Sequence, residues 1–170
     1  LSDRTFWRFD ISLDSKTAVY SVKNNFMNYT TELYSVPIDG SADPIMLNET
    51  LGAGGTLDDV FQISKDSNWV VYIADYDYMS DPNLYSVPID GSGTPIILNE
   101  PLAYAGEIGD FVISENSSQV VYRAEQDTEY VTELYSVPID GSSSSIKLNN
   151  DLTSGNKIHR YKISACLLYT

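Results

Sequence analysis

The chain has 170 residues, of which 42% are hydrophobic, and it contains 13 Tyr, 5 Phe and 2 Trp. This composition excludes a disordered chain and predicts one domain with an ample core. The formal net charge is −14, from 24 acidic and 10 basic residues. Nucleic-acid backbones and anionic membranes both require a basic face, so the charge argues against either as a partner.

Few features of the sequence indicate a compartment. Cys166 is the only cysteine, so no disulfide can form within the chain, and its expected role is a buried structural thiol. No run of about 18 apolar residues predicts a membrane span, and the opening LSDRTFWRFD lacks the regions of a signal peptide. The chain opens without Met and close to strand-like sequence, so we expect it to be a piece of a longer protein.

The octapeptide LYSVPIDG occurs three times. It begins at Leu33, Leu84 and Leu134, at spacings of 51 and 50 residues. A repeat of this length is typical of propeller blades, in which each unit is a small antiparallel sheet that needs a neighbour to bury its faces. We expect a single domain over 1–170, with units at about 5–48, 57–99 and 107–149 and a partial unit at 157–170.

Each unit predicts four short strands, and the octapeptide is the third. In the first unit the other three are Phe9–Ser12, Ala18–Tyr20 and Pro44–Asn48. The second unit has them at Phe61–Ser64, Val70–Tyr72 and Pro95–Asn99. The third has them at Phe111–Ser114, Val120–Tyr122 and Ser145–Asn149, and Tyr161–Ser164 begins the fourth unit.

The octapeptide also predicts its own local geometry. Its Asp-Gly pair closes a tight hairpin, because Gly adopts positive φ at low cost, and its Pro stands at a strand end, because it has no N–H for the ladder. In the first strand of each unit, alternation places the aromatic residue and the following Ile on one face, where adjacent sheets should pack. On the opposite face, Asp110 and Arg160 lie at equivalent heights, so we expect either an ion pair or chance placement on a solvated strand.

The order of these elements resembles the WD40-like β-propeller repeat of the TolB type over residues 5–170. The matching segments are SLDSKTAVY, SKDSNWVVY and SENSSQVVY, each followed by a segment containing LYSVPIDGS. The Pro and Gly of that family's SPDG turn are absent, which marks a divergent branch. The resemblance implies an all-β fold of four-stranded antiparallel blades, about six to eight in a ring, and an extracytoplasmic location, periplasmic or secreted.

Three blades and the start of a fourth leave apolar sheet flanks open. We therefore expect the flanks to be covered, either by association into a homo-oligomeric ring or by further blades of a longer chain.

The search for catalytic residues gives none. His159 is the only histidine, no Gly-x-Ser-x-Gly elbow is present, and Ser64 and Ser114 are expected to be turn residues. The segment Gly52–Gly55 lacks the Lys-Ser/Thr of a phosphate loop and is interpreted as a flexible loop between blades. We expect no enzyme activity and no cofactor other than the cation considered next.

Alternate carboxylates in ADYDYMSDPN are the candidate metal ligands. Asp75, Asp77 and Asp81 would lie on one side of a hairpin and share a hard cation such as Ca²⁺. The third unit offers Glu125, Asp127 and Glu129 in the same hairpin. The alternative is a solvated acidic turn, because neither copy has the Gly and terminal Glu of an EF-hand loop.

Four tyrosines outside the repeated strands are the candidate binding residues: Tyr76, Tyr78, Tyr104 and Tyr130. Exposed tyrosines favour protein or carbohydrate contacts. The alternative is packing of one hairpin on the next.

The sequence thus predicts a non-catalytic β-propeller module for binding or scaffolding, with its ligand at loops that differ between units. Two alternatives stay open: the propeller part of a larger secreted enzyme such as a peptidase, and a structural surface-array protein.

Overall fold

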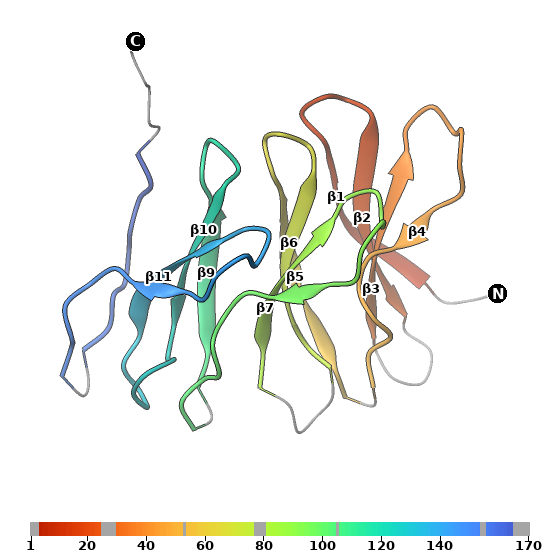
Figure 1. Cartoon of the computed structure of the whole chain (residues 1–170). Coiled ribbons are helices and arrows are strands. Elements are labelled where there is room, and N and C mark those ends of the chain that lie inside the picture. The colour runs from red at the N-terminus through yellow and green to blue at the C-terminus, as the bar shows by residue number, and fades with distance from the viewer. Residues whose placement is uncertain are drawn as a thin grey trace, which may run out of the picture.

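Strands form all of the regular structure in the described part of the chain (Figure 1). The computed structural model describes residues 4–24, 30–52, 54–76, 81–104, 106–153 and 156–164. Over these residues no helix long and apolar enough to cross a membrane is present. The strands are β1 Arg4–Ile11, β2 Thr17–Asn24, β3 Thr31–Pro37, β4 Ile45–Met46, β5 Thr56–Ile63, β6 Trp69–Asp75, β7 Asn83–Pro88, β8 Ile96–Ile97, β9 Ile108–Ile113, β10 Gln119–Ala124, β11 Glu133–Pro138 and β12 Ile146–Lys147.

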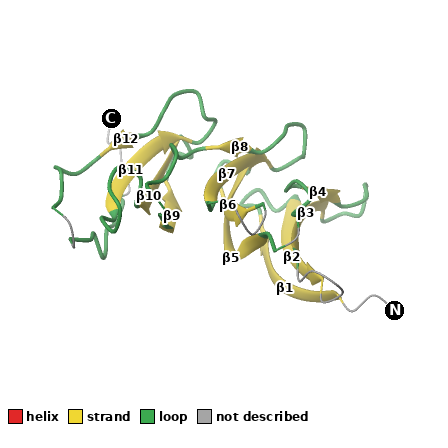
Figure 2. Cartoon of the chain, turned by 90° about the horizontal axis from the view of Figure 1, so that it is seen from below, coloured by secondary structure: helices red, strands yellow, loops and turns green. Residues whose placement is uncertain are grey.

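The strands make three four-stranded antiparallel sheets, one for each predicted unit. Their orders are β1-β2-β3-β4, β5-β6-β7-β8 and β9-β10-β11-β12, so within each sheet consecutive strands are paired. Figure 2 shows the sheets side by side, with β1, β5 and β9 along one edge and β4, β8 and β12 along the other. The predicted all-β fold is therefore confirmed. The fourth strands, at two residues each, are shorter than the apolar segments that predicted them.

A serine closes the first hairpin of every sheet. In the second sheet the Ser64 hydroxyl donates to Asp66 Oδ1 and accepts from the Trp69 backbone N–H at 2.9 Å. Ser12 and Ser114 make the corresponding bonds in the other sheets. The predicted turn role of Ser64 and Ser114 is thus confirmed, because each hydroxyl satisfies backbone and side-chain groups of its own turn.

A second serine stands where the SPDG turn has glycine. Ser15, Ser67 and Ser117 have φ of 59°, 63° and 60°, a left-handed conformation that L-residues rarely adopt. Two of these hydroxyls join neighbouring sheets: Ser67 Oγ accepts from Asp14 N at 3.1 Å, and Ser117 Oγ accepts from Asp66 N at 3.0 Å. The departure from glycine therefore supplies a hydrogen bond at each junction, which glycine could not make.

The Asp-Gly turn of the octapeptide also makes a junction. Gly91 and Gly141 have φ of 67° and 64°, as the tight-hairpin prediction requires. A Cβ on Gly91 would stand 2.6 Å from Ile45 Cγ2, and one on Gly141 would stand 2.7 Å from Ile96 Cγ2. Each turn thus packs directly on the fourth strand of the preceding sheet, so these positions need glycine for space as well as for φ.

Apolar side chains fill both junctions. Phe61 of the second sheet packs with Val19 and Leu33 of the first, and the Arg8 guanidinium carbon lies 5.4 Å from the Phe61 ring centroid. Phe111 of the third sheet packs in the same way against the second. At this junction Gln62 adds a polar link, donating to Phe111 O at 2.7 Å and accepting from Ile113 N at 3.2 Å. The predicted packing face of the first strands is confirmed.

The equivalent residues at the outer flanks are exposed. Phe9 is 75% exposed, whereas Phe61 is 1% exposed. Ile38 is exposed although its octapeptide equivalents in the other sheets are buried, and Leu148 is exposed although Leu47 and Leu98 are buried. Each sheet therefore depends on a neighbour to bury its apolar flank.

The start of the fourth unit lies along the third sheet without forming a strand within residues 156–164. Lys157 makes a parallel bridge to Thr132, and the Tyr161 hydroxyl donates to Val121 O at 3.1 Å. Asp110 pairs with Arg123 on the adjacent strand β10 and not with Arg160, because Arg123 lies within the same sheet. Cys166 lies outside the described residues.

Truncation of the aromatic residue should show which flanks are covered. We expect Phe61→Ala to lower the free energy of unfolding by about 3–5 kcal/mol, through lost burial and a cavity. Phe9→Ala, at the equivalent but exposed position, should change it by less than about 0.5 kcal/mol. Urea unfolding followed by tyrosine fluorescence measures both, and equal losses in the two variants would contradict the asymmetry.

Candidate functional site at the loop end of the sheets

The connections that differ between units gather at one end of the sheets, the lower end in Figure 1, which we call the loop end. They are the hairpins between the second and third strands and the loops between successive sheets. Backbone bonds tie the two kinds of connection together: Gly52 N donates to Tyr76 O at 2.6 Å, and Ala103 N donates to Glu125 O at 2.9 Å. Each of these two loops is therefore held against the hairpin of the sheet that follows it.

Two glycines make this close approach feasible. A Cβ on Gly55 would stand 2.5 Å from Tyr76 O, and a Cβ on Gly106 would stand 2.6 Å from Glu125 O. Both glycines are buried. The sequence predicted a flexible loop at Gly52–Gly55, but the structure gives Gly55 a packing role, because its backbone lies against the next hairpin.

Paired tyrosines support the loop end from inside each sheet. Tyr72 and Tyr85 stack with ring centroids 5.4 Å apart, and Tyr122 and Tyr135 stack at 5.5 Å. Burial raises the pKa of Tyr85 and of Tyr122 to about 12. These phenols stay neutral at physiological pH and serve as packing and hydrogen-bonding groups.

Tyr76 belongs to this packed layer. Its ring meets Tyr85 edge-on at 5.2 Å, and its hydroxyl lies 3.4 Å from that of Tyr72. In the third sheet Gln126 takes the corresponding place and accepts a bond from the Tyr122 hydroxyl at 2.8 Å. Tyr76 is half-buried, so only part of its ring is available to a ligand.

Tyr104 and Tyr130 point to solvent. They are 84% and 61% exposed. Tyr130 has φ of 63°, and its backbone N–H donates to Glu125 Oε2 at 3.2 Å. Left-handed backbone at a bulky residue costs of order 1–3 kcal/mol, so the carboxylate of Glu125 helps hold this ring outward. Tyr78 lies outside the described residues.

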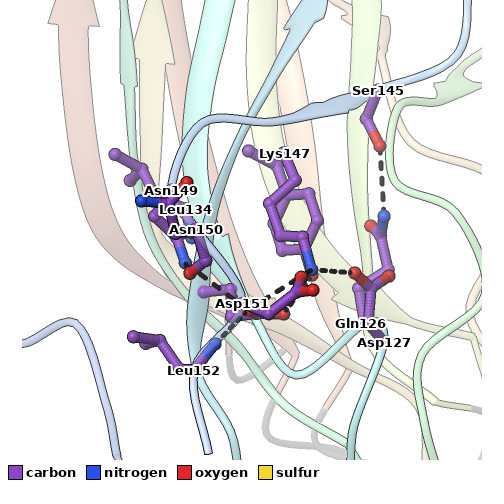
Figure 3. A network of polar contacts seen from close by, with 11 residues as sticks. Gln126, Asp127, Leu134, Ser145, Lys147, Asn149, Asn150, Asp151 and Leu152 are labelled. Carbon is purple, nitrogen blue, oxygen red and sulfur yellow. Dashed lines mark hydrogen bonds and ion pairs between the residues drawn. The ribbon is translucent and has the colours of Figure 1, made fainter.

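A lysine surrounded by carboxylates distinguishes the third sheet (Figure 3). Lys147 Nζ lies 2.5 Å from Asp151 Oδ1, 2.9 Å from Asp127 Oδ2 and 3.4 Å from Glu133 Oε2. Its hydrogen bonds to Asp151 and Asp127 raise the pKa of Lys147, and the same contact lowers the pKa of Asp151. Each of these two shifts favours the charged form of its group, so the contact between Lys147 and Asp151 is an ion pair at neutral pH.

Glu133 is the buried member of this cluster, with its side chain 2% exposed. Its carboxylate also accepts bonds from Leu152 N and the Tyr135 hydroxyl, both at 3.2 Å. These contacts join strand β11, strand β12 and the loop after β12. The equivalent positions in the second sheet hold Asn83 and Ile97, with Asn99 Nδ2 donating to Asn83 Oδ1 at 3.1 Å.

A second lysine fixes the neighbouring hairpin. Lys157 Nζ lies 2.9 Å from Glu125 Oε1, and the Glu125 side chain is nearly fully buried. The Thr132 hydroxyl donates to the same carboxylate oxygen at 3.3 Å. Two of the three carboxylates proposed as cation ligands in the third unit therefore pair with lysines: Glu125 with Lys157 and Asp127 with Lys147.

The second-unit candidates for a cation are partly described. Asp75 Oδ1 accepts a bond from Thr56 N, and Asp81 is exposed. Asp77 lies outside the described residues. Among the described residues, no three His, Cys, Asp or Glu side chains come together as a metal site. Calcium at Asp75, Asp77 and Asp81 stays a prediction.

His159 lies on the exposed side of the C-terminal segment, in a cavity of about 400 Å³ with Asp110, Arg160, Tyr161 and Lys162. Its carbonyl accepts a bond from Arg123 Nη1 at 3.0 Å.

Sequence reasoning missed Lys147 and Glu133. The sequence does contain a sign of the cluster: Lys147 stands at a repeat position that is apolar in the other two units, where it is Met46 and Ile97. A charged residue at a repeated apolar position indicates a new local partner.

Comparison with solved structures agrees with the fold described above. No protein-family model and no curated protein sequence matches the chain. Among solved structures, the AtxE2 isopeptidase variant bound to astexin3-dC4 is 9% identical at a TM-score of 0.55, over 88% of this chain and 30% of that one. The puromycin hydrolase mutant complexed with PGG is 15% identical at 0.57, over 88% and 22%.

A structure from a study of two prolyl endopeptidases is 10% identical at a TM-score of 0.55, over 88% of this chain and 22% of that one. The matching parts are propeller domains. The three sheets are β-propeller blades. The chain spans between 22% and 30% of these larger proteins, and at such low identities the similarity concerns the fold alone. The putative TolB from Agrobacterium tumefaciens, 14% identical over 89% of this chain and 64% of that one, aligns with a TM-score of only 0.40.

Converting the third blade's charged pair into the second blade's neutral pair tests the network. Lys147→Ile alone leaves the buried Glu133 carboxylate without its ammonium partner and should cost about 1–3 kcal/mol of unfolding free energy. The double variant Glu133→Asn with Lys147→Ile should return to within about 1 kcal/mol of the wild type. Denaturant unfolding measures the cycle, and equal losses in the single and double variants would contradict a charge-specific role.

Titration of the full chain with CaCl₂ tests the cation hypothesis. The hypothesis predicts a saturable heat and a raised Tm, both removed by Asp81→Asn, because oxygen ligands of reduced charge bind Ca²⁺ weakly. Asp81 is exposed, so the variant should fold normally. A wild-type titration without heat or thermal shift would establish the acidic turn as solvated.

Proposed function

We propose that this chain is a non-catalytic β-propeller module for binding or scaffolding, whose ligand meets the loop end. One observation carries the proposal: the same residues recur in the strands and turns of successive blades, whereas the connections at the loop end differ between blades. The stacked tyrosines, serine turns and Asp-Gly turns recur in successive blades. The Lys147 cluster and the exposed Tyr104 and Tyr130 occur at single positions.

Rigidity supports this function. The loops rest on backbone bonds to the next hairpin, and the third blade's hairpin is held by ion pairs of Lys147 and Lys157. A ligand that meets a preformed surface requires less ordering on binding. Two exposed phenols on such a surface offer large contact areas at small entropic cost, suited to a protein or carbohydrate ligand.

The absence of catalysis is part of the proposal. The Ser64 and Ser114 hydroxyls serve their own turns, and His159 is exposed with its carbonyl bound to Arg123. A serine nucleophile requires an adjacent base and an orienting group.

A second candidate is the propeller part of a larger enzyme. It is favoured by the structures named as an isopeptidase, a puromycin hydrolase and prolyl endopeptidases, of which this chain matches 22–30%. In that case catalysis would reside in another domain of a longer protein, and the module would remain non-catalytic.

The TolB-type repeat and an extracytoplasmic location belong to the same proposal and rest on the repeated sequence motifs. The exposed Phe9, Ile38 and Leu148 support a further partner: another blade of this type, from a second copy or from a longer chain.

Selection of binders tests the loop end. The full chain, immobilised through one biotin, is panned against a phage-displayed peptide library and applied to a glycan microarray. We expect the selected binders to lose about tenfold or more in affinity, about 1.4 kcal/mol, on the double variant Tyr104→Ser with Tyr130→Ser. Both side chains are exposed, so this variant should fold.

The matched control is Leu13→Ser, which removes an exposed apolar side chain at the opposite end of the first blade. It should leave the selected binders unaffected. Binders that ignore the tyrosine substitutions, or that are weakened equally by Leu13→Ser, would refute a ligand surface at the loop end.

A further inference from the structure

The opposite end of the blades carries a second candidate surface, which we call the turn end. The first hairpin turn of each blade lies there, at the upper end in Figure 1, and the Asp-Gly turn lines a cavity with it in the second and third blades. A cavity of about 470 Å³ opens there in the second blade, lined by Ser67, Asn68, Trp69, Pro88, Ile89, Asp90 and Ser92. A second cavity of about 480 Å³ opens between the second and third blades.

The two cavities are lined by equivalent residues of successive blades. The third-blade residues Ser117, Ser118, Gln119, Pro138, Ile139, Asp140 and Ser142 line the second cavity, each fifty positions after its counterpart in the first. Trp69 lines both cavities. Each volume lies within the range of about 300–1,000 Å³ that is typical of small-molecule sites.

Trp69 is the residue that departs from the repeat. The equivalent positions hold Thr17 and Gln119, and the indole is packed against the core between the second and third blades while part of it stays exposed. A tryptophan held in this way is a preformed flat apolar surface shared by two cavities. Each cavity is also lined by one Pro-Ile pair from an octapeptide.

The rims of the cavities are polar. Asp90 and Asp140 each accept a bond from the backbone N–H two residues ahead, at 2.9 and 3.0 Å. Hydrogen bonds with Ser92 and Ser142 lower the pKa of these carboxyls, so both are ionised at neutral pH. Asn68 Nδ2 donates to Asp66 Oδ2 at 2.9 Å, and Gln119 Oε1 accepts from the Ser136 hydroxyl at 3.1 Å. A side-chain amide has two N–H donors and an oxygen that accepts two bonds, so each amide keeps further groups for a ligand, as each carboxylate does. This donor and acceptor mixture suits hydroxyl groups.

We propose that the two cavities flanking Trp69 bind a neutral oligosaccharide, with a sugar ring on the indole and sugar hydroxyls hydrogen-bonded to Asn68, Asp90, Gln119 and Asp140. The carboxylates disfavour phosphate and other anions. A cationic peptide would be attracted by the acidic charge, so it is the competing occupant in the test below. Trp69 lines both cavities, so an oligosaccharide can occupy the two cavities at once with the indole between them.

This site lies at the opposite end of the blades from Tyr104 and Tyr130, so it is independent of the loop-end proposal. The probes are cellohexaose, laminarihexaose, xylohexaose and chitohexaose, added to the full chain in a Trp7→Phe background that leaves Trp69 as the only indole. We expect saturable Trp69 fluorescence changes and calorimetric heat with at least one probe at millimolar concentration. Affinity should be the same at 50 and 500 mM NaCl, because the ligand is uncharged.

Two variants assign the site. In calorimetry, Trp69→Gln, which installs the residue of the third blade, should weaken binding about tenfold or more, equivalent to about 1.4 kcal/mol. Asn68→Ser installs the exposed third-blade residue Ser118 and should weaken binding by a smaller factor with an unchanged Tm. The double variant Tyr104→Ser with Tyr130→Ser should bind as the wild type does.

Three outcomes would overturn the proposal. They are no binding of any of the four hexaoses, undiminished binding by both Trp69→Gln and Asn68→Ser, and displacement of a bound hexaose by hexa-arginine at 500 mM NaCl. The last result would assign the cavities to cationic peptides.

Discussion

The packing of one blade on the next holds this structure together. A four-stranded sheet has two faces, and each blade here buries an aromatic ring only where a preceding blade covers it, as Phe61 and Phe111 show. The Asp-Gly turn reinforces the contact by resting on the fourth strand of the preceding blade. The same Asp-Gly turn meets the same strand position at both junctions, so the octapeptide contributes to packing between blades as well as forming a turn.

Polar groups fix the junctions in register. The hydroxyls of Ser67 and Ser117 accept a backbone N–H from the preceding blade, and Gln62 exchanges two hydrogen bonds with the backbone of β9. Apolar packing alone is non-directional, whereas these bonds form in one alignment only. The left-handed serines therefore combine a strained backbone with a specific link. The packed blades carry connections that differ from one another at the loop end and two equivalent cavities at the turn end.

The third blade shows how a repeat acquires local chemistry without losing its frame. Lys147 and Glu133 stand at positions that are apolar or amide-bearing in the second blade, yet the strand pairing is unchanged. The buried carboxylate is satisfied by an ammonium group, a hydroxyl and a backbone N–H. These contacts join β11, β12 and the loop after β12 through one carboxylate.

Local patterns in the sequence are sufficient to predict the strands of the three complete blades, their turns and the repeat length. Alternation of apolar residues, the Asp-Gly pairs and the recurrence of LYSVPIDG are local properties, and each follows from backbone geometry and burial within a few residues. The same locality made Ser64 and Ser114 recognisable as turn residues.

Which polar and aromatic side chains meet depends on how the strands and blades are arranged in space. Asp110 pairs with Arg123 and not with Arg160, Glu125 and Asp127 bind ammonium groups, and Tyr76 packs against Tyr85. Trp69 became a shared wall of two cavities only when neighbouring turns came together. These contacts join residues distant in sequence or depend on side-chain direction, and hydrophobic periodicity contains no information about which partner a polar side chain will reach.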